Sequence, residues 1–194
     1  MSLPTLTFSD DQAEAHDRLA ELLRAAGVDI DEATTTPRAE GKTRIMAVIG
    51  KAGSGKTLLL AELTRAVADA GAESVTLVNT LLGMVIDTDT GRPVLGAGGG
   101  GASGIGIHPV AVRAVHDVRA AHPDLAIVGV GGVATGRDAA ELLLAGANAV
   151  QVGTATFADP RAPWTIQDEL IDWAQRRGID RLADVSGAAH RGGL

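Results

Sequence analysis

The chain has 194 residues, a length that supports one domain with a buried core, and a net charge of −7. This acidic balance, without a run of lysine or arginine, argues against a nucleic-acid-binding face. The absence of cysteine excludes disulfides and cysteine-based metal chemistry, and no apolar run reaches the ~20 residues of a membrane-spanning helix. The first residues have no secretory leader pattern, so we expect a cytoplasmic protein.

The first predicted element is a helix that begins at Ser9. Ser9 and Gln12 have the spacing of a capping box, and Gly27 suits the position just after a helix end. Residues 29–43 are polar and contain proline and glycine, which is typical of a linker. We therefore expect residues 1–43 to form an N-terminal helix and a linker.

Four strand-and-helix units are predicted to follow, and they make residues 44–194 a single α/β domain. Their strands cover residues 44–49, 74–79, 125–130 and 149–153, and their helices cover residues 55–70, 109–121, 136–146 and 163–177. Strands that alternate with helices in this way are typical of a parallel sheet. We expect about four parallel βα units, arranged either as half of a TIM-like barrel or as an open doubly wound sheet.

The chain makes a longer excursion between strand 74–79 and helix 109–121. Residues 84–95 contain two β-like pieces around Asp89-Thr90-Gly91, which predicts a β-hairpin insertion. A glycine-rich loop over residues 98–106 follows. Ligands of parallel sheets bind at the carboxyl ends of the strands, and the glycine clusters of this chain come directly after strands. We therefore expect the anion-binding loops to share one edge of the sheet.

A phosphate-binding loop is predicted at residues 50–57, which read GKAGSGKT between an apolar run and a helix. Backbone N–H groups in such a loop cradle the phosphates of ATP, and the hydroxyl of Thr57 suits a nucleotide-bound Mg²⁺. The candidate residues are Gly50, Gly53, Ser54, Gly55, Lys56 and Thr57.

Nucleotide hydrolysis needs a further acidic group on a second strand to hold Mg²⁺. The next predicted strand ends in Asn79-Thr80 and supplies none. Asp87 in the hairpin is a formal candidate, with a solvated turn residue as the alternative interpretation. We therefore predict no catalytic residue.

Residues 1–70 resemble the opening of the ATPase domain of RecD-like helicases, in the segment FSDDQAEAHDRL and the phosphate loop after it. The resemblance implies that Gln12 reads the adenine edge of a nucleotide, and the alternative is that Gln12 only caps the first helix. The parts that such a helicase has after its first βα unit find no match in this chain, so helicase activity is not implied.

Residues 73–190 resemble the C-terminal part of class 1 dihydroorotate dehydrogenases, especially the 1B type. The matching stretches are VTLVNTLLGM, DTDTGRPVL, GGGGASGIGIHPVAVR and IVGVGGVATGRDAAELLLAGANAVQVGTATF. The resemblance implies a TIM barrel that carries FMN at the carboxyl ends of its strands.

The same resemblance implies roles for particular residues. Asn79 and Thr80 match a pair that contacts the pyrimidine substrate, and Gly104 matches a glycine near FMN. The groups that would hold the FMN phosphate are Gly131, Gly132, Gly153 and Thr154. Tight-turn geometry alone is the alternative explanation for these glycines. His108 stands where the family usually has lysine.

The resemblance covers only the sixth to eighth strands of an eight-stranded barrel, and the cysteine base of the 1B type has no counterpart here. The phosphate loop stands where the fifth unit belongs. We therefore interpret the chain as an engineered or recombined chimera that binds a phosphate ligand, without a complete active site.

Two alternatives stay open. The first is an FMN-dependent oxidoreductase that oligomerisation completes, and the second is a folded protein whose inherited loops hold no ligand. Exposed strand edges predict a homodimer, with no nucleic-acid or membrane partner.

Overall fold

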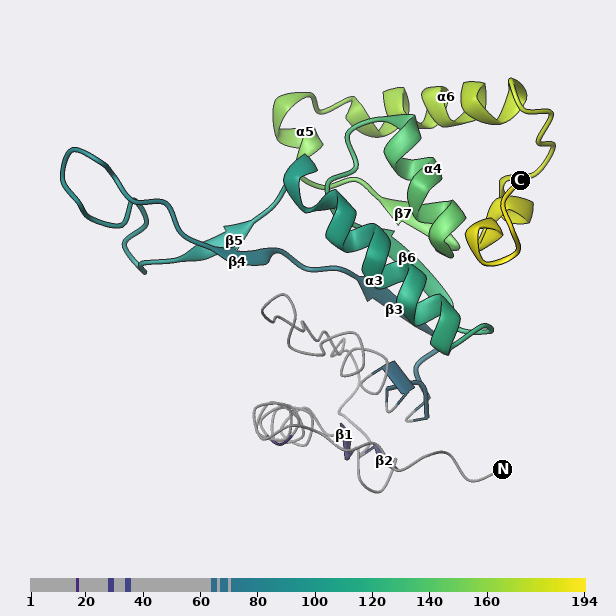
Figure 1. Ribbon diagram of the computed structural model, residues 1–194, viewed down its shortest axis with the longest axis horizontal. Coiled ribbons are helices and arrows are strands. Elements are labelled where there is room, and N and C mark those ends of the chain that lie inside the picture. The colour runs from purple at the N-terminus through teal and green to yellow at the C-terminus, as the bar shows by residue number, and fades with distance from the viewer. Residues whose placement is uncertain (1–16, 18–27, 30–33, 36–63, 66, 70) are drawn as a thin grey trace. The chain divides into compact units, whose positions relative to one another are not determined.

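The computed structural model describes residues 17, 28–29, 34–35, 64–65, 67–69 and 71–194 (Figure 1). The chain divides into two compact units, and the second includes Glu73–Leu194. In the first unit, β1 (Val28–Asp29) pairs antiparallel with β2 (Thr34–Thr35), within or beside the predicted linker.

Little of the predicted N-terminal half falls within these described residues. Asp17, inside the predicted first helix, is helical, and so are residues 64–65 and 67–69 of the predicted helix 55–70. The predicted strand 44–49 lies outside the described residues. The domain boundary at residue 43 therefore stays a prediction.

Among the described residues, three parallel strands form the central sheet of the second unit. They are β3 (Ser74–Leu77), β6 (Ala126–Val130) and β7 (Ala149–Gln151), in the order β3–β6–β7. In this register Val128 lies between Thr76 and Ala149. The predicted α/β fold with parallel strands is confirmed, although β3 and β7 end two residues earlier than the apolar pattern indicated.

The three long helices in residues 71–194 lie within two residues of their predicted bounds. They are α3 (His108–Ala121), α4 (Gly136–Ala145) and α6 (Ala162–Gln175). α3 and α6 carry proline in the first turn, where its missing N–H is not needed. α4 begins with a capping box, in which the Thr135 hydroxyl accepts the N–H of Asp138 while the Asp138 carboxylate accepts the N–H of Thr135.

Shorter helices that the sequence pattern did not predict complete the unit. They are η1 (Ile105–Ile107), α5 (Ala155–Ala158), η2 (Leu182–Val185) and η3 (Ala188–His190). Each is only three or four residues long, too short to give a hydrophobic repeat. No helix among those described is both long enough and apolar enough to span a membrane.

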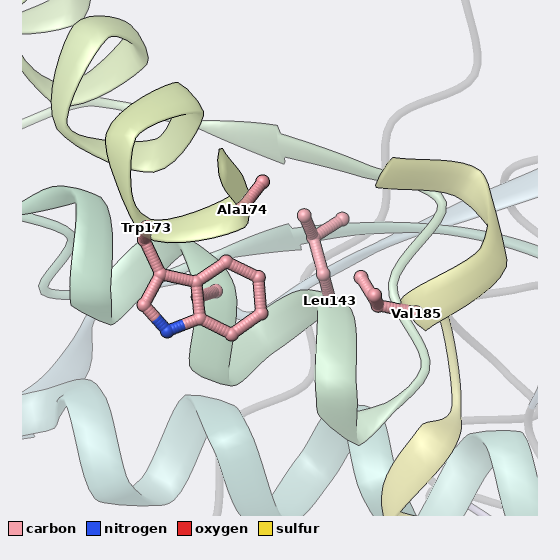
Figure 2. Packing of buried hydrophobic residues seen from close by; sticks show 5 residues of the cluster. Leu143, Trp173, Ala174 and Val185 are labelled. Carbon is pink, nitrogen blue, oxygen red and sulfur yellow. The ribbon is translucent and has the colours of Figure 1, made fainter. Parts of the chain in front are cut away.

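Two hydrophobic layers hold this unit together. The first lies where α3 and α4 cover one face of the sheet (Figure 1), with the fully buried side chains of Ile127, Leu142, Val115 and Val118. The second lies between α4 and the C-terminal segment, with Leu143, Trp173, Ala174 and Val185 packed together (Figure 2). α4 and α6 approach closely because Gly136 has no side chain, and a Cβ there would overlap the backbone of Leu170.

The opposite face of the sheet is much less covered. Alternate residues of a strand point to the same face. On this face Thr76, Ala149 and Gln151 are exposed, and Val128 and Val130 are only partly buried. The sheet therefore has one packed face and one open face.

A two-stranded arm, residues 81–102, extends away from the sheet (Figure 1). β4 (Leu81–Gly83) pairs antiparallel with β5 (Gly100–Ala102), and Ile86 bridges Pro93 farther out. The predicted hairpin is present, but the prediction of a loop over all of residues 98–106 is wrong because β5 lies within it. β5 can lie against Thr80 because Gly101 has no side chain, and a Cβ at Gly101 would overlap the side chain of Thr80.

Candidate functional site

The loops around the carboxyl ends of the parallel strands converge. Gly131-Gly132 follow β6, Gly153-Thr154 follow β7, and Gly104 precedes η1. A Cβ built on Gly132 would lie 2.7 Å from the carbonyl oxygen of Gly104, and one built on Gly104 would lie 3.7 Å from Cγ2 of Thr154. The structure thus brings together the predicted FMN-binding residues, while the glycines of the phosphate loop lie outside the described residues.

The backbone at this convergence explains part of the glycine pattern without a ligand. Gly104, Gly131 and Gly132 have φ angles of +86°, +138° and +67°, which side-chain-bearing residues rarely adopt. Gly153 is different, because a Cβ placed there would meet nothing within 4 Å. Its backbone faces open space, and this opening suits the close approach of an anionic group such as a phosphate.

Asn79 and Thr80 follow β3 at the same end of the sheet. The Asn79 side-chain oxygen accepts the N–H of Thr80 at 2.7 Å. Thr80 packs against the backbone of Gly101, and Asn79 is exposed. Their position at this edge agrees with the predicted geometry, and their assignment as substrate contacts stays a prediction.

His108 is a buried residue that lies beneath the glycine turn. Its Nδ1 lies 2.9 Å from the carbonyl oxygen of Gly131. Its Nε2 lies 3.3 Å from Glu141 Oε2 and 4.0 Å from Asp138 Oδ1, yet makes no hydrogen bond of acceptable geometry. The sequence marked this position only as a departure from lysine, and a helix-initial histidine gives no signal of burial.

The nucleotide-binding candidates cannot be placed in this site. Gln12 and the phosphate loop at residues 50–57 lie outside the described residues and stay predictions. Asp87 acts as a turn residue, because its Oδ1 accepts the N–H groups of Asp89 and Thr90 at 2.9 and 3.0 Å. These hydrogen bonds, led by the one from Thr90, lower the pKa of Asp87 below its ordinary value.

A pocket of about 590 Å³ lies at the amino ends of the strands, away from the glycine turns. Arg119 lines it and donates to the carbonyl oxygen of Gly146, to Asn148 Oδ1 and to the carbonyl oxygens of His122 and Pro123. Since its guanidinium is occupied by protein acceptors, Arg119 stabilises the fold here. Within the described part of the chain, no cluster of three metal-ligating side chains is found.

Comparison with known proteins gives a consistent result. A family model described as dihydroorotate dehydrogenase matches residues 59–173. A Solibacter usitatus protein, provisionally named dihydroorotate dehydrogenase A (fumarate), is 49% identical over 125 residues, which are 64% of this chain and 41% of that protein. The catalytic subunit of dihydroorotate dehydrogenase B (NAD(+)) from Bacteroides thetaiotaomicron is 36% identical over 159 residues, 77% of this chain and 52% of that protein.

The family-model match has two limits. It includes the candidate residues from Asn79 to Thr154 and leaves out the phosphate loop at residues 50–57, whereas the Bacteroides thetaiotaomicron match covers 77% of the chain and is too long to lie wholly after that loop. The chain also spans only about half, or less, of the length of these relatives.

Proposed function

Because the family model matches more than half of it, the chain belongs to the dihydroorotate dehydrogenase family, and we propose that residues 73–194 form the flavin-phosphate-binding part of an FMN-dependent oxidoreductase. The convergence of the glycine turns, with open space beside the backbone of Gly153, carries this proposal. The resemblance to the family assigns FMN to this edge of the sheet.

Backbone groups are suited to hold the phosphate of FMN. N–H groups in glycine turns bind anions without a side chain that would block the approach. Gly132 and Gly153 would supply such groups, and Thr154 would add a hydroxyl. FMN, when bound, supplies the group that accepts a hydride from the substrate.

The remaining contacts of the proposed site come from the residues after β3 and from a second copy of the chain. Asn79 and Thr80 would hydrogen-bond a pyrimidine substrate at the end of β3. Within the described sheet, β3 and β7 are edge strands whose outer backbone groups suit pairing with another chain. We propose that a homodimer uses these edges and completes the flavin site, in a cytoplasmic protein.

Titration with FMN, followed by quenching of flavin fluorescence, tests the cofactor. Gly132→Ala should weaken binding about tenfold or more, because the new Cβ would clash with Gly104 and strain a positive φ. Gly178→Ala is a matched control, because Gly178 has φ +66° but open space around its Cβ position. The proposal fails if the wild type does not bind FMN, or if Gly132→Ala and Gly178→Ala both bind FMN as tightly as the wild type does.

The motif at residues 50–57 supports a second proposal, in which a recombined chimera binds ATP–Mg²⁺ through Lys56. The motif lies outside the range that the family model matches, and the comparisons support the flavin proposal better. ATP–Mg²⁺ should raise the melting temperature of the wild type and not of Lys56→Ala, with FMN binding unchanged. No shift with either ligand would instead favour a protein whose loops hold no ligand.

A further inference from the structure

His108 connects three elements of the second unit with one imidazole ring. It is the first residue of α3, its Nδ1 contacts the turn after β6, and its Nε2 faces the first turns of α4. The carbonyl oxygen of Gly131 only accepts hydrogen bonds, so Nδ1 carries the proton and donates. This is the one hydrogen bond of the ring that the structure records.

That hydrogen bond also determines where the N–H of Gly132 points. The peptide group between Gly131 and Gly132 is planar and trans, so its C=O and N–H point in opposite directions. Because the carbonyl points toward buried His108, the N–H points away from it. A peptide between two glycines has low steric barriers to rotation, and it needs a fixed partner to keep one orientation.

We propose that His108 is a positioning residue that holds the Gly131–Gly132 peptide so that the N–H of Gly132 faces a bound phosphate group. This inference rests on the proposed function and extends it to a residue that would not touch the cofactor. The carboxylate oxygens of Asp138 and Glu141 lie 4.0 and 3.3 Å from Nε2, so the other side of the ring faces α4. Close packing also restricts the Gly131–Gly132 peptide, since a Cβ built on Gly132 would lie 2.8 Å from Cβ of His108.

Three substitutions separate positioning from simple packing. His108→Asn places an amide N–H the same number of bonds from the backbone as Nδ1, so it retains the donor to Gly131. His108→Gln moves the donor one bond farther, and His108→Ala removes it. His116→Ala is the control, because His116 lies on the same helix and stacks on His190.

Two measurements follow the series. In the ligand-free protein, the residual dipolar coupling of the Gly132 N–H reports the direction of that bond and does not depend on the ring current of the imidazole. It should change in His108→Ala and His108→Gln, and stay near its wild-type value in His108→Asn and His116→Ala. The FMN dissociation constant should rise on the order of tenfold in the first pair and stay within about threefold in the second.

The outcomes distinguish this inference from the proposed function. If the wild type binds FMN and His108→Ala binds it equally well, positioning is overturned while the flavin proposal stands. If the wild type does not bind FMN, the flavin proposal and the ligand part of this inference fail, and the NMR series still decides whether His108 orients the peptide. If all three His108 substitutions change the NMR parameter and the FMN dissociation constant equally, His108 contributes by packing alone.

Discussion

The packed body of the second unit and its two-stranded arm use the same kinds of apolar residue in opposite ways. In the body, formed by the sheet with α3, α4 and α6, Ile127 and Leu142 are fully buried. In the arm, residues 81–102, Leu82 is 75% exposed and Val85 is 66% exposed. Burial is therefore decided by which elements can form layers, and residue type alone does not predict it.

The two regions also differ in the interactions that hold them. The body depends on buried side chains between a sheet and helices, whose contribution grows with the apolar area removed from water. The arm depends on local hydrogen bonds, such as those from Val94 N–H to the Val85 carbonyl at 3.0 Å and from Asp87 N–H to the Arg92 carbonyl at 2.8 Å. Substitutions of buried residues in the body should therefore lower the free energy of unfolding of the second unit. Substitutions in the arm should change only the local structure of the arm.

The largest expected effect is a cavity in the body. Leu142→Ala should lower the free energy of unfolding by about 2–5 kcal/mol, because Leu142 is fully buried and the site cannot collapse freely. Val85→Ala in the arm should change it by less than about 0.5 kcal/mol. Urea unfolding with an unchanged m-value measures both, and similar losses in the two variants would contradict the comparison.

A smaller effect is expected at the polar connection in the body, by which we mean the hydrogen bonds from Arg119 on α3 to the turn between α4 and β7. Arg119→Ala should cost about 1–3 kcal/mol, because the carbonyl oxygen of Gly146, at the turn between α4 and β7, loses both of its guanidinium donors. Burial is the main influence on this guanidinium and lowers its pKa, while the Asp124 carboxylate acts in the opposite direction.

Two variants serve as controls for that connection. Arg119→Lys keeps the charge but loses the planar fork of donors, so it should recover only part of the loss. Arg113→Ala, which removes the pair between the exposed Arg113 side chain and Asp117 on the same helix, should cost about 1 kcal/mol or less. If Arg113→Ala costs as much as Arg119→Ala, then charge on α3, and not the bonds of Arg119, accounts for the effect.

The body was far more predictable from the sequence than the arm. Apolar periodicity located α3, α4 and α6 because each buries one face, and the glycines after β6 marked the candidate turn. The arm buries nothing, so no periodic signal separated β5 from a glycine loop. The role of His108 was also hidden, because it depends on contacts with Gly131 and Glu141 that are distant in the sequence.

The smallest expected effect is a change with pH at the tip of the arm. The pKa of Asp87 is lower in the folded protein, mainly through the N–H of Thr90, so its ionised form stabilises the turn. This contribution is present above the unfolded pKa of about 4 and is lost as the pH falls through the folded pKa below it. The NMR amide signals of Asp89 and Thr90 should therefore move below about pH 4.

Asp87→Asn makes this last prediction specific. Asparagine keeps a side-chain oxygen that accepts the same N–H groups but does not ionise in this range, so the part of the Thr90 movement that comes from residue 87 should disappear. The signal of Leu142 should not move with the Asp89 and Thr90 signals, because the arm and the body are held by different interactions. If Leu142 follows the same titration in the wild type, the arm contributes to the stability of the body, and the two regions unfold as one.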